Sequence, residues 1–150
     1  MKRWLSRMGS VALFAAAFSP VAMAANAIEV YRDPSCGCCA AWISYLRAQS
    51  YTVAVHEDQA MTAVKTRLGV PGDVASCHTA LIDGYVIEGH VPVEDIRRLL
   101  AEHPNARGLA VPGMPMGSPG MEMGAPERYD VVLIEQDGSL RVFATHGPKA

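Results

Sequence analysis

The stretch DPSCGCCAAW, residues 33–42, places three of the chain's four cysteines within four positions. A pattern typical of a β-strand precedes it at residues 27–32, and a helical pattern free of glycine and proline follows at residues 40–49. Thiols this close together favour a redox reaction or a soft metal ion over ordinary structural contacts. The stretch therefore predicts a reactive or metal-binding cysteine cluster where a strand leads into a helix, with Ser35 as the N-cap.

Strand and helix patterns alternate along the next part of the chain. They predict strands over residues 51–57, 79–83 and 85–90, and helices over residues 59–68 and 92–103. Asp83-Gly84 is a two-residue hairpin turn between the second and third of these strands. The order β-α-β-α-β-β-α, with Cys36 and Cys39 spaced as C-x-x-C at the first strand–helix junction, is that of the thioredoxin and glutaredoxin folds. In that arrangement Cys77, in the loop before residues 79–83, faces the cluster.

The last part of the chain differs in composition. Residues 108–126 are rich in glycine and proline and contain four methionines within ten positions, so we predict a loop there. Two strand patterns, at residues 129–135 and 140–145, flank a turn and predict an antiparallel pair. The predicted fold class is therefore α/β with a mixed sheet: a thioredoxin-like core with an added C-terminal β-hairpin.

The N-terminus has the features of a cleaved signal peptide. Lys2, Arg3 and Arg7 precede a short apolar run at residues 11–18, and Ala22-Met23-Ala24 supplies a cleavage signal. The run is shorter than the roughly 18 residues that a membrane span needs, so we expect no membrane insertion after cleavage. Residues 1–24 are then a signal peptide and residues 25–150 one exported domain, whose net charge changes from −2 to −5 on cleavage. An acidic domain argues against nucleic acid as a partner.

The spacing of the cysteines favours a metal site over simple redox cycling. On a helix start Cys36 and Cys39 lie on one face, and dithiol–disulfide exchange needs only one such pair, so Cys38 is surplus to it. Structural zinc sites usually contain two separated cysteine pairs, whereas here one crowded group is accompanied by a single distant Cys77. Cu(I) accepts bridging thiolates and also thioether sulfur. We therefore predict a Cu(I) site with Cys36, Cys38, Cys39 and Cys77 as ligands.

The methionines and histidines are weaker candidates for ligands. Any single methionine is more often a packing residue, but four in a loop without helical spacing indicate that one or two bind the metal. We prefer Met114 and Met121 and keep Met116 and Met123 as possible ligands. His78, beside Cys77, is equally well explained as a ligand or as a polar residue facing solvent, and His90 is more simply structural. The remaining histidines are predicted to lie on the surface; these are His56, His103 and His146.

Three motifs together resemble one known family. They are CGCC (residues 36–39) after DPS (residues 33–35), TALIDGYVIEGHVP (residues 79–92) and GMPMGSPGME (residues 113–122). The chain resembles the CopG-type periplasmic copper-resistance proteins over nearly the whole of residues 25–150. The resemblance implies a thioredoxin-like fold, copper binding, a periplasmic location and work alongside other periplasmic copper-handling or efflux proteins.

Three functions stay open at this point. The leading hypothesis is a periplasmic Cu(I)-binding protein whose thiolates bridge more than one ion. The alternative is a thiol–disulfide or copper oxidoreductase with Cys36 as nucleophile and Cys39 as resolving thiol, so the sequence does not decide whether the protein is an enzyme. A third possibility, two structural disulfides in a binding module, predicts no free thiols and no metal.

Overall fold

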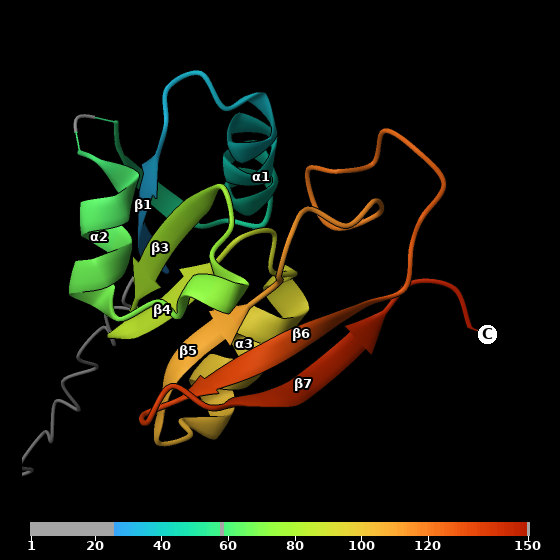
Figure 1. Cartoon of the computed structure of the whole chain (residues 1–150). Coiled ribbons are helices and arrows are strands. Elements are labelled where there is room, and N and C mark those ends of the chain that lie inside the picture. The colour runs from blue at the N-terminus through green and yellow to red at the C-terminus, as the bar shows by residue number, and fades with distance from the viewer. Residues whose placement is uncertain (1–25, 58, 150) are drawn as a thin grey trace, which may run out of the picture.

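The computed structural model describes residues 26–57 and 59–149 of the chain, and in this part seven strands form one mixed sheet in the order β2-β1-β3-β4-β5-β6-β7 (Figure 1). The pairs β1–β2 and β4–β5 are parallel, and the other neighbours are antiparallel. The strands are β1 (Ala27–Arg32), β2 (Thr52–His56), β3 (His78–Ile82), β4 (Tyr85–Glu88), β5 (Ala106–Ala110), β6 (Tyr129–Glu135) and β7 (Leu140–His146). The helices are α1 (Gly37–Ala48), α2 (Met61–Leu68) and α3 (Val93–Glu102), with a short 3-10 helix η1 (Gly72–Val74) before β3.

The order of these elements confirms the predicted fold class. The core runs β1-α1-β2-α2-β3-β4-α3, and β6 and β7 form the predicted C-terminal hairpin. The turn Asp83-Gly84 joins β3 to β4 as expected, because both residues have positive φ angles, of 48° and 80°.

One strand was missed. Residues 106–110 form β5, whereas the sequence pattern placed residues from 108 onward in a glycine/proline-rich loop. β5 pairs with β4 on one side and with β6 on the other, so it joins the C-terminal hairpin to the core sheet. Gly108 is required there because a Cβ at this position would lie 1.8 Å from the Val86 carbonyl oxygen on β4. Gly108, which indicated a loop in the sequence, thus lies where two strands approach each other closely.

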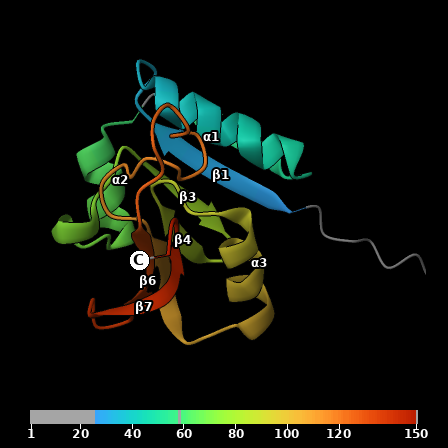
Figure 2. The same ribbon diagram turned by 90° about the vertical axis from the view of Figure 1, so that its right-hand side faces the viewer.

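The helices divide between the two faces of the sheet. Figure 2 shows α1 and α3 on one face and α2 on the other. The larger core lies under α1 and α3, where Trp42, Leu46 and Leu99 are buried against alternate strand residues such as Leu109 and Leu133. A smaller cluster lies on the other face; it contains Val74, Ala110 and Ile134. Successive side chains of β5 and β6 point to opposite faces of the sheet, so these two strands contribute residues to both cores.

The N-terminal segment cannot be compared with its prediction. The predicted signal peptide, residues 1–24, lies outside the described residues. Within the part of the chain that the structure describes, no helix has the length and apolar character needed to span a bilayer.

His146 corrects a prediction, because it is not a free surface residue. Its Nε2 lies 2.6 Å from Oδ2 of Asp95, a buried residue in the first turn of α3. Burial raises the pKa of the Asp95 carboxyl, and the hydrogen bond with His146 partly opposes this rise. The pair therefore ties the last strand to α3 and offsets part of the cost of a buried carboxylate.

Replacing His146 with alanine is expected to lower the free energy of unfolding by about 1–3 kcal/mol at pH 6. The loss should be smaller at pH 4. Because the pKa of Asp95 is raised in the folded state, its contribution to the free energy of unfolding is fully present below its pKa in the unfolded state. This contribution is lost as the pH rises through its pKa in the folded state. Without His146 the folded pKa rises further, so the deficit grows between pH 4 and pH 6.

Urea unfolding of wild type and His146→Ala at both pH values measures this difference. His103→Asn is the control, since His103 is exposed and has a left-handed conformation that asparagine tolerates. An equal deficit at both pH values would contradict the role given to Asp95.

Candidate metal centre

The cysteine cluster begins at the cap of α1. Cys36 is the N-cap residue, and its Sγ accepts a hydrogen bond of 3.4 Å from the Cys39 backbone N–H. The prediction that Ser35 caps the helix is wrong, because its N–H and hydroxyl both donate to Asp33 Oδ1. Arg32 fixes the turn by donating from Nη1 to the Cys36 carbonyl at 2.8 Å. This places all three clustered thiols within the first turn, beside free backbone N–H groups that favour negative charge.

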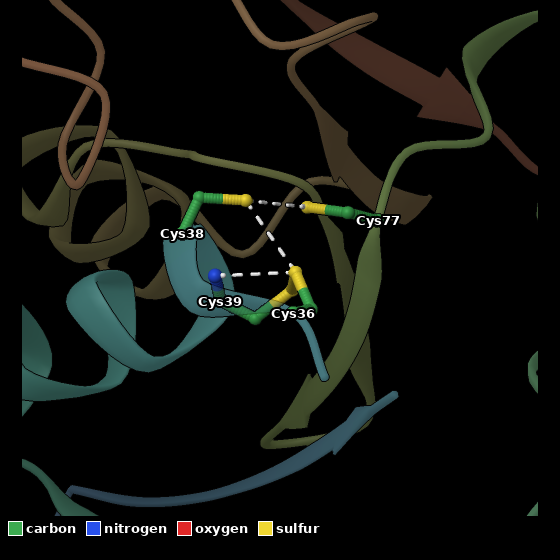
Figure 3. A group of neighbouring side chains, drawn as sticks. All are labelled: Cys36, Cys38, Cys39 and Cys77. Atoms are coloured by element: carbon green, nitrogen blue, oxygen red, sulfur yellow. Dashed lines mark hydrogen bonds between the residues drawn. A yellow bond between two sulfur atoms is a disulfide. The ribbon is translucent and has the colours of Figure 1, made fainter. Parts of the chain in front are cut away.

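The four cysteine sulfurs lie together, as the element order predicted. The Sγ atoms are all within 4.8 Å of one another, although Cys77 comes from the other side of the cluster, just before β3. Figure 3 shows Cys38 facing Cys77 across a gap, and the Sγ–Sγ distance is 3.9 Å. Cys36 and Cys39 form a disulfide, and Cys38 and Cys77 are free thiols. One disulfide with two free thiols does not agree with the possibility of two structural disulfides.

The four cysteines differ in burial, and one of the two free thiols has a shifted pKa. Cys39 is fully buried, while Cys36, Cys38 and Cys77 are half-buried. Burial, followed by the neighbouring Cys38, raises the pKa of the Cys77 thiol to about 11. A group with this pKa is a neutral thiol at pH 7, and a metal ion must displace its proton to bind the sulfur.

The methionine loop contributes one sulfur directly to the cluster. Met114 Sδ lies 3.9 Å from Cys38 Sγ and its side chain is half exposed. Met121, the other preferred ligand, is buried, and its backbone is held by hydrogen bonds with Gly117 and Ser118. Met123 is 79% exposed, and the structure does not bring it to the cysteines. Met116 lies against Gly124 within the loop.

Gly120 lets this loop approach α1. Its φ angle is 86°, and a Cβ there would lie 2.9 Å from the Trp42 backbone nitrogen and 3.2 Å from the Cys38 carbonyl oxygen. The loop therefore packs its backbone directly on the turn that carries the cysteines, with no room for a side chain between them.

Gly120→Ala should destabilise the protein more than Gly138→Ala. Gly138 has the same φ of 86° but no atom within 4 Å of its Cβ position, so both variants have the left-handed backbone cost of about 1–2 kcal/mol. Only Gly120→Ala adds the clash with α1, which we expect to cost about 1–3 kcal/mol more. Urea unfolding of the two variants measures the difference, and equal losses would show that the loop is free to move away from α1.

A buried carboxylate holds the strand that presents Cys77. Glu88 on β4 is fully buried and accepts hydrogen bonds from the Ser76 N–H and the Thr79 hydroxyl, both at 2.6 Å. Lys65 of α2 pairs with the same carboxylate. The three contacts join the residue before Cys77 to a second strand and a helix, so the position of the thiol is set from three sides.

Two histidines complete the surroundings of Cys77. His78 Nδ1 and His90 Nε2 each lie 3.3 Å from Cys77 Sγ, and both residues are buried. Burial lowers the pKa of His90, and lowers that of His78 well below the ordinary value, with the neighbouring His90 adding to the second effect. Both imidazoles are thus neutral at pH 7. The interpretation of His78 as a residue facing solvent is wrong.

The placement of His90 was not predicted, although the sequence contained a signal for it. β3 and β4 pair with Thr79 opposite Glu88 and Ile82 opposite Tyr85. Continuing this register by two residues beyond Thr79 brings Cys77 opposite His90. A two-residue turn fixes the register of a hairpin, so the predicted turn at Asp83-Gly84 already implied that these two side chains are neighbours.

The chemistry of the cluster follows from its donors. Once the Cys36–Cys39 disulfide is reduced, four cysteine sulfurs and one thioether within a small, half-buried space form a soft donor set, which suits Cu(I) better than oxygen-preferring ions. The Cys36–Cys39 pair can also undergo disulfide exchange, since one sulfur is partly accessible at a helix N-terminus and the other is buried.

Comparisons with known proteins agree with this chemistry. Residues 74–121 match a family described as "Protein of unknown function, DUF411", and a search of curated proteins finds no match. Two solved structures, form 1 and form 2 of copper resistance protein CopG, are similar to the chain. They are 50% and 49% identical to it, each with a TM-score of 0.76 over 81% of this chain and 98% of the other. At this identity and coverage, the chain belongs to the CopG family of copper resistance proteins.

Proposed function

We propose that this protein binds Cu(I) in the periplasm and serves in copper resistance. In the reduced protein the four cysteine thiolates would hold the ion, with Met114 as a capping thioether and Met121 as a further ligand from the same loop. The observation that carries the proposal is the convergence of four cysteine sulfurs, from α1 and from the start of β3, within 4.8 Å. The similar solved structures, which are of a copper resistance protein, support copper as the metal.

The charge of the cluster favours more than one ion. Four thiolates confined to a half-buried site carry four negative charges, and burying like charges without compensation is costly. A single Cu(I) supplies one positive charge, whereas several ions bridged by shared sulfurs neutralise more of them. The negative charge of the four thiolates therefore favours a site that holds more than one Cu(I) ion.

Anaerobic titration of the fully reduced protein with Cu(I), in competition with a chromophoric chelator, tests both parts of the proposal. We expect more than one Cu(I) per chain. A stoichiometry of zero would overturn the proposal, and a stoichiometry of one would overturn its multinuclear part. Met114→Ala should weaken binding, while Met123→Ala, which removes a more exposed methionine of the same loop, should leave it unchanged.

The Cys36–Cys39 disulfide specifically favours a second candidate, a thiol–disulfide or copper oxidoreductase. Cys36 would attack a substrate disulfide and Cys39 would resolve the mixed disulfide, so that two thiols are oxidised as the substrate gains two electrons and two protons. Turnover of a disulfide substrate that survives Cys38→Ser and Met114→Ala but not Cys36→Ser would favour this activity. Absence of turnover in the wild type would exclude it.

Export is part of the proposal. Residues 1–24 would be removed as a signal peptide, leaving residues 25–150 as one metal-binding domain that works with other periplasmic copper-handling or efflux proteins. Intact mass spectrometry of protein recovered from the periplasm tests the boundary. The expected N-terminus is Ala25, and recovery of the full-length chain from the cytoplasmic fraction would contradict it.

A further inference from the structure

The sheet has two edge strands, β2 and β7, and they differ in how far their outer sides are blocked. The register of β7 with β6 shifts between Val131 and Val132. The Phe143 carbonyl of β7 also accepts a hydrogen bond of 2.7 Å from Arg98 Nη2. Register shifts and covering side chains of this kind keep an edge from pairing with another chain. β2 pairs with β1 in regular register along its whole length, so β2 is the edge more open to an additional strand.

The hydrogen bonds of β2 show which backbone groups it presents at this edge. The Thr52 N–H donates to the Asn26 carbonyl at 3.1 Å, so the backbone groups of Thr52 point toward β1. These groups alternate in direction along a strand, and those of Val53 and Val55 therefore point out of the sheet. The Val53 carbonyl has a long contact there, 3.5 Å from Arg47 Nη2. The N–H and carbonyl of Val55 have no partner on this side among the described residues, so they can pair with a further strand.

A groove of about 330 Å³ runs along the same edge, between β2 and α1. One wall is a single face of α1, formed by residues three or four positions apart; these are Ala40, Ile43, Ser44 and Arg47. Val55 and Glu57 form the other wall. In an added strand, the residue directly opposite Val55 points to the same face of the sheet as Val55 does. Its side chain would therefore enter the groove.

The charges along the groove favour an acidic occupant. Glu57 forms an ion pair with Arg32 at the end of the groove near the start of α1, so these two charges compensate each other. Arg47 lies at the other end, in the last turn of α1, and is exposed. Among the described residues Arg47 contacts a carbonyl and no carboxylate. The groove thus has one uncompensated positive charge, on a chain whose net charge is −2.

We propose that β2 is the docking site for an extended, acidic segment of a partner protein. The backbone of the segment would pair with Val55, an apolar side chain would enter the groove beside Ile43, and an acidic side chain would pair with Arg47. Proteins often recognise peptides by adding a strand to a sheet edge. Main-chain hydrogen bonds then give the affinity, and pockets for alternate side chains give the specificity.

The docking site lies beside the cysteine cluster but does not depend on it. Arg32 lines the groove and donates to the Cys36 carbonyl at 2.8 Å, so a segment docked on β2 would end next to the turn that carries the cysteines. The groove itself is lined by no cysteine, methionine or histidine. Docking can therefore be tested without copper, and failure of the Cu(I) proposal would leave it standing.

NMR titration of isotope-labelled protein in the disulfide form, with synthetic peptides as probes and no metal, tests the proposal. One peptide alternates valine with threonine and aspartate, and a second has lysine in place of each aspartate. We expect the backbone amide signals of residues 53–57 to shift and those of residues 140–146 to stay unchanged. The acidic peptide should bind at least about 5-fold more tightly than the basic one, because reversing the charge replaces an attraction to Arg47 by a repulsion.

Two variants separate the backbone contribution from the charge contribution. Val55→Pro removes the N–H that faces the edge, a position where an edge strand tolerates proline, and should abolish binding of both peptides. Arg47→Glu changes an exposed side chain and should make the basic peptide bind more tightly than the acidic one. Arg128→Glu is the matched control, since Arg128 is exposed and does not line the groove; it should leave both affinities unchanged.

Several results would overturn the proposal. They are absence of binding by the folded wild type, equal affinity for the two peptides, and shifts at β7 in place of β2. A dimer in sedimentation equilibrium that Val55→Pro dissociates would assign the edge to a second copy of the chain, which also contradicts it. Circular dichroism establishes which variants are folded. If Val55→Pro does not fold, the reversal of preference in Arg47→Glu decides the question.

Discussion

Cys77→Ser is expected to weaken Cu(I) binding by about 100-fold or more and to lower the number of ions bound. Even residues that only orient a metal ligand change affinity about 10–100-fold when they are replaced, and Cys77 is itself a proposed ligand, on the side of the cluster opposite α1. A serine hydroxyl has nearly the same shape as the thiol but is a hard donor that Cu(I) disfavours. Competition with a chromophoric chelator under anaerobic conditions measures both the affinity and the stoichiometry.

The folded state of this variant should be nearly unchanged, because Ser differs from Cys by one atom and position 77 is half-buried. A free energy of unfolding within about 1 kcal/mol of the wild type establishes that the lost affinity is an effect on the site. Unaltered Cu(I) affinity in a folded Cys77→Ser protein would restrict the copper site to the three cysteines of α1.

The largest expected effect on stability comes from Glu88→Ala. The change leaves Lys65 without its partner and the Ser76 N–H without its acceptor. Breaking a buried ion pair by removing one member costs about 3–5 kcal/mol, because the remaining charge stays buried and uncompensated. The variant should also bind Cu(I) more weakly, since Ser76 precedes Cys77. Urea unfolding and the Cu(I) titration measure the two effects.

Glu102→Ala provides the matched control, since Glu102 forms an exposed ion pair with Arg98 in the same protein. Exposed pairs of this kind contribute about 0–1 kcal/mol. The double variant Lys65→Met and Glu88→Leu should recover part of the stability by replacing the pair with apolar side chains. If Glu88→Ala costs no more than Glu102→Ala, the buried pair does not hold the strand that presents Cys77.

Much of the site could be predicted because its chemistry is local in the sequence. The cysteines at 36, 38 and 39 share one helix start, and the order of elements alone placed Cys77 opposite them. Met114 lies beside Cys38, and its preference as a metal ligand stays a prediction. Spacing and element order are strong evidence where the ligands lie at the ends of regular elements.

The parts that could not be predicted depend on pairing between distant segments. β5 forms because β4 and β6 both offer it hydrogen bonds, and a short run containing Gly108 shows no strand pattern by itself. The contact of His146 with Asp95 has no local signal, because the two residues are 51 positions apart in the chain. The position of His90, in contrast, follows from the register of one hairpin.

The two sides of the cysteine cluster also have a consequence for folding. Cys38 and Cys77 are separated by 39 positions in the chain, and an ion held by both would join α1 to β3 as a reversible cross-link. Closing a loop of this length removes about 4 kcal/mol of conformational freedom from the unfolded chain. Copper bound across the gap would thus act as a removable cross-link, and the free energy of unfolding would rise with the logarithm of the free copper concentration.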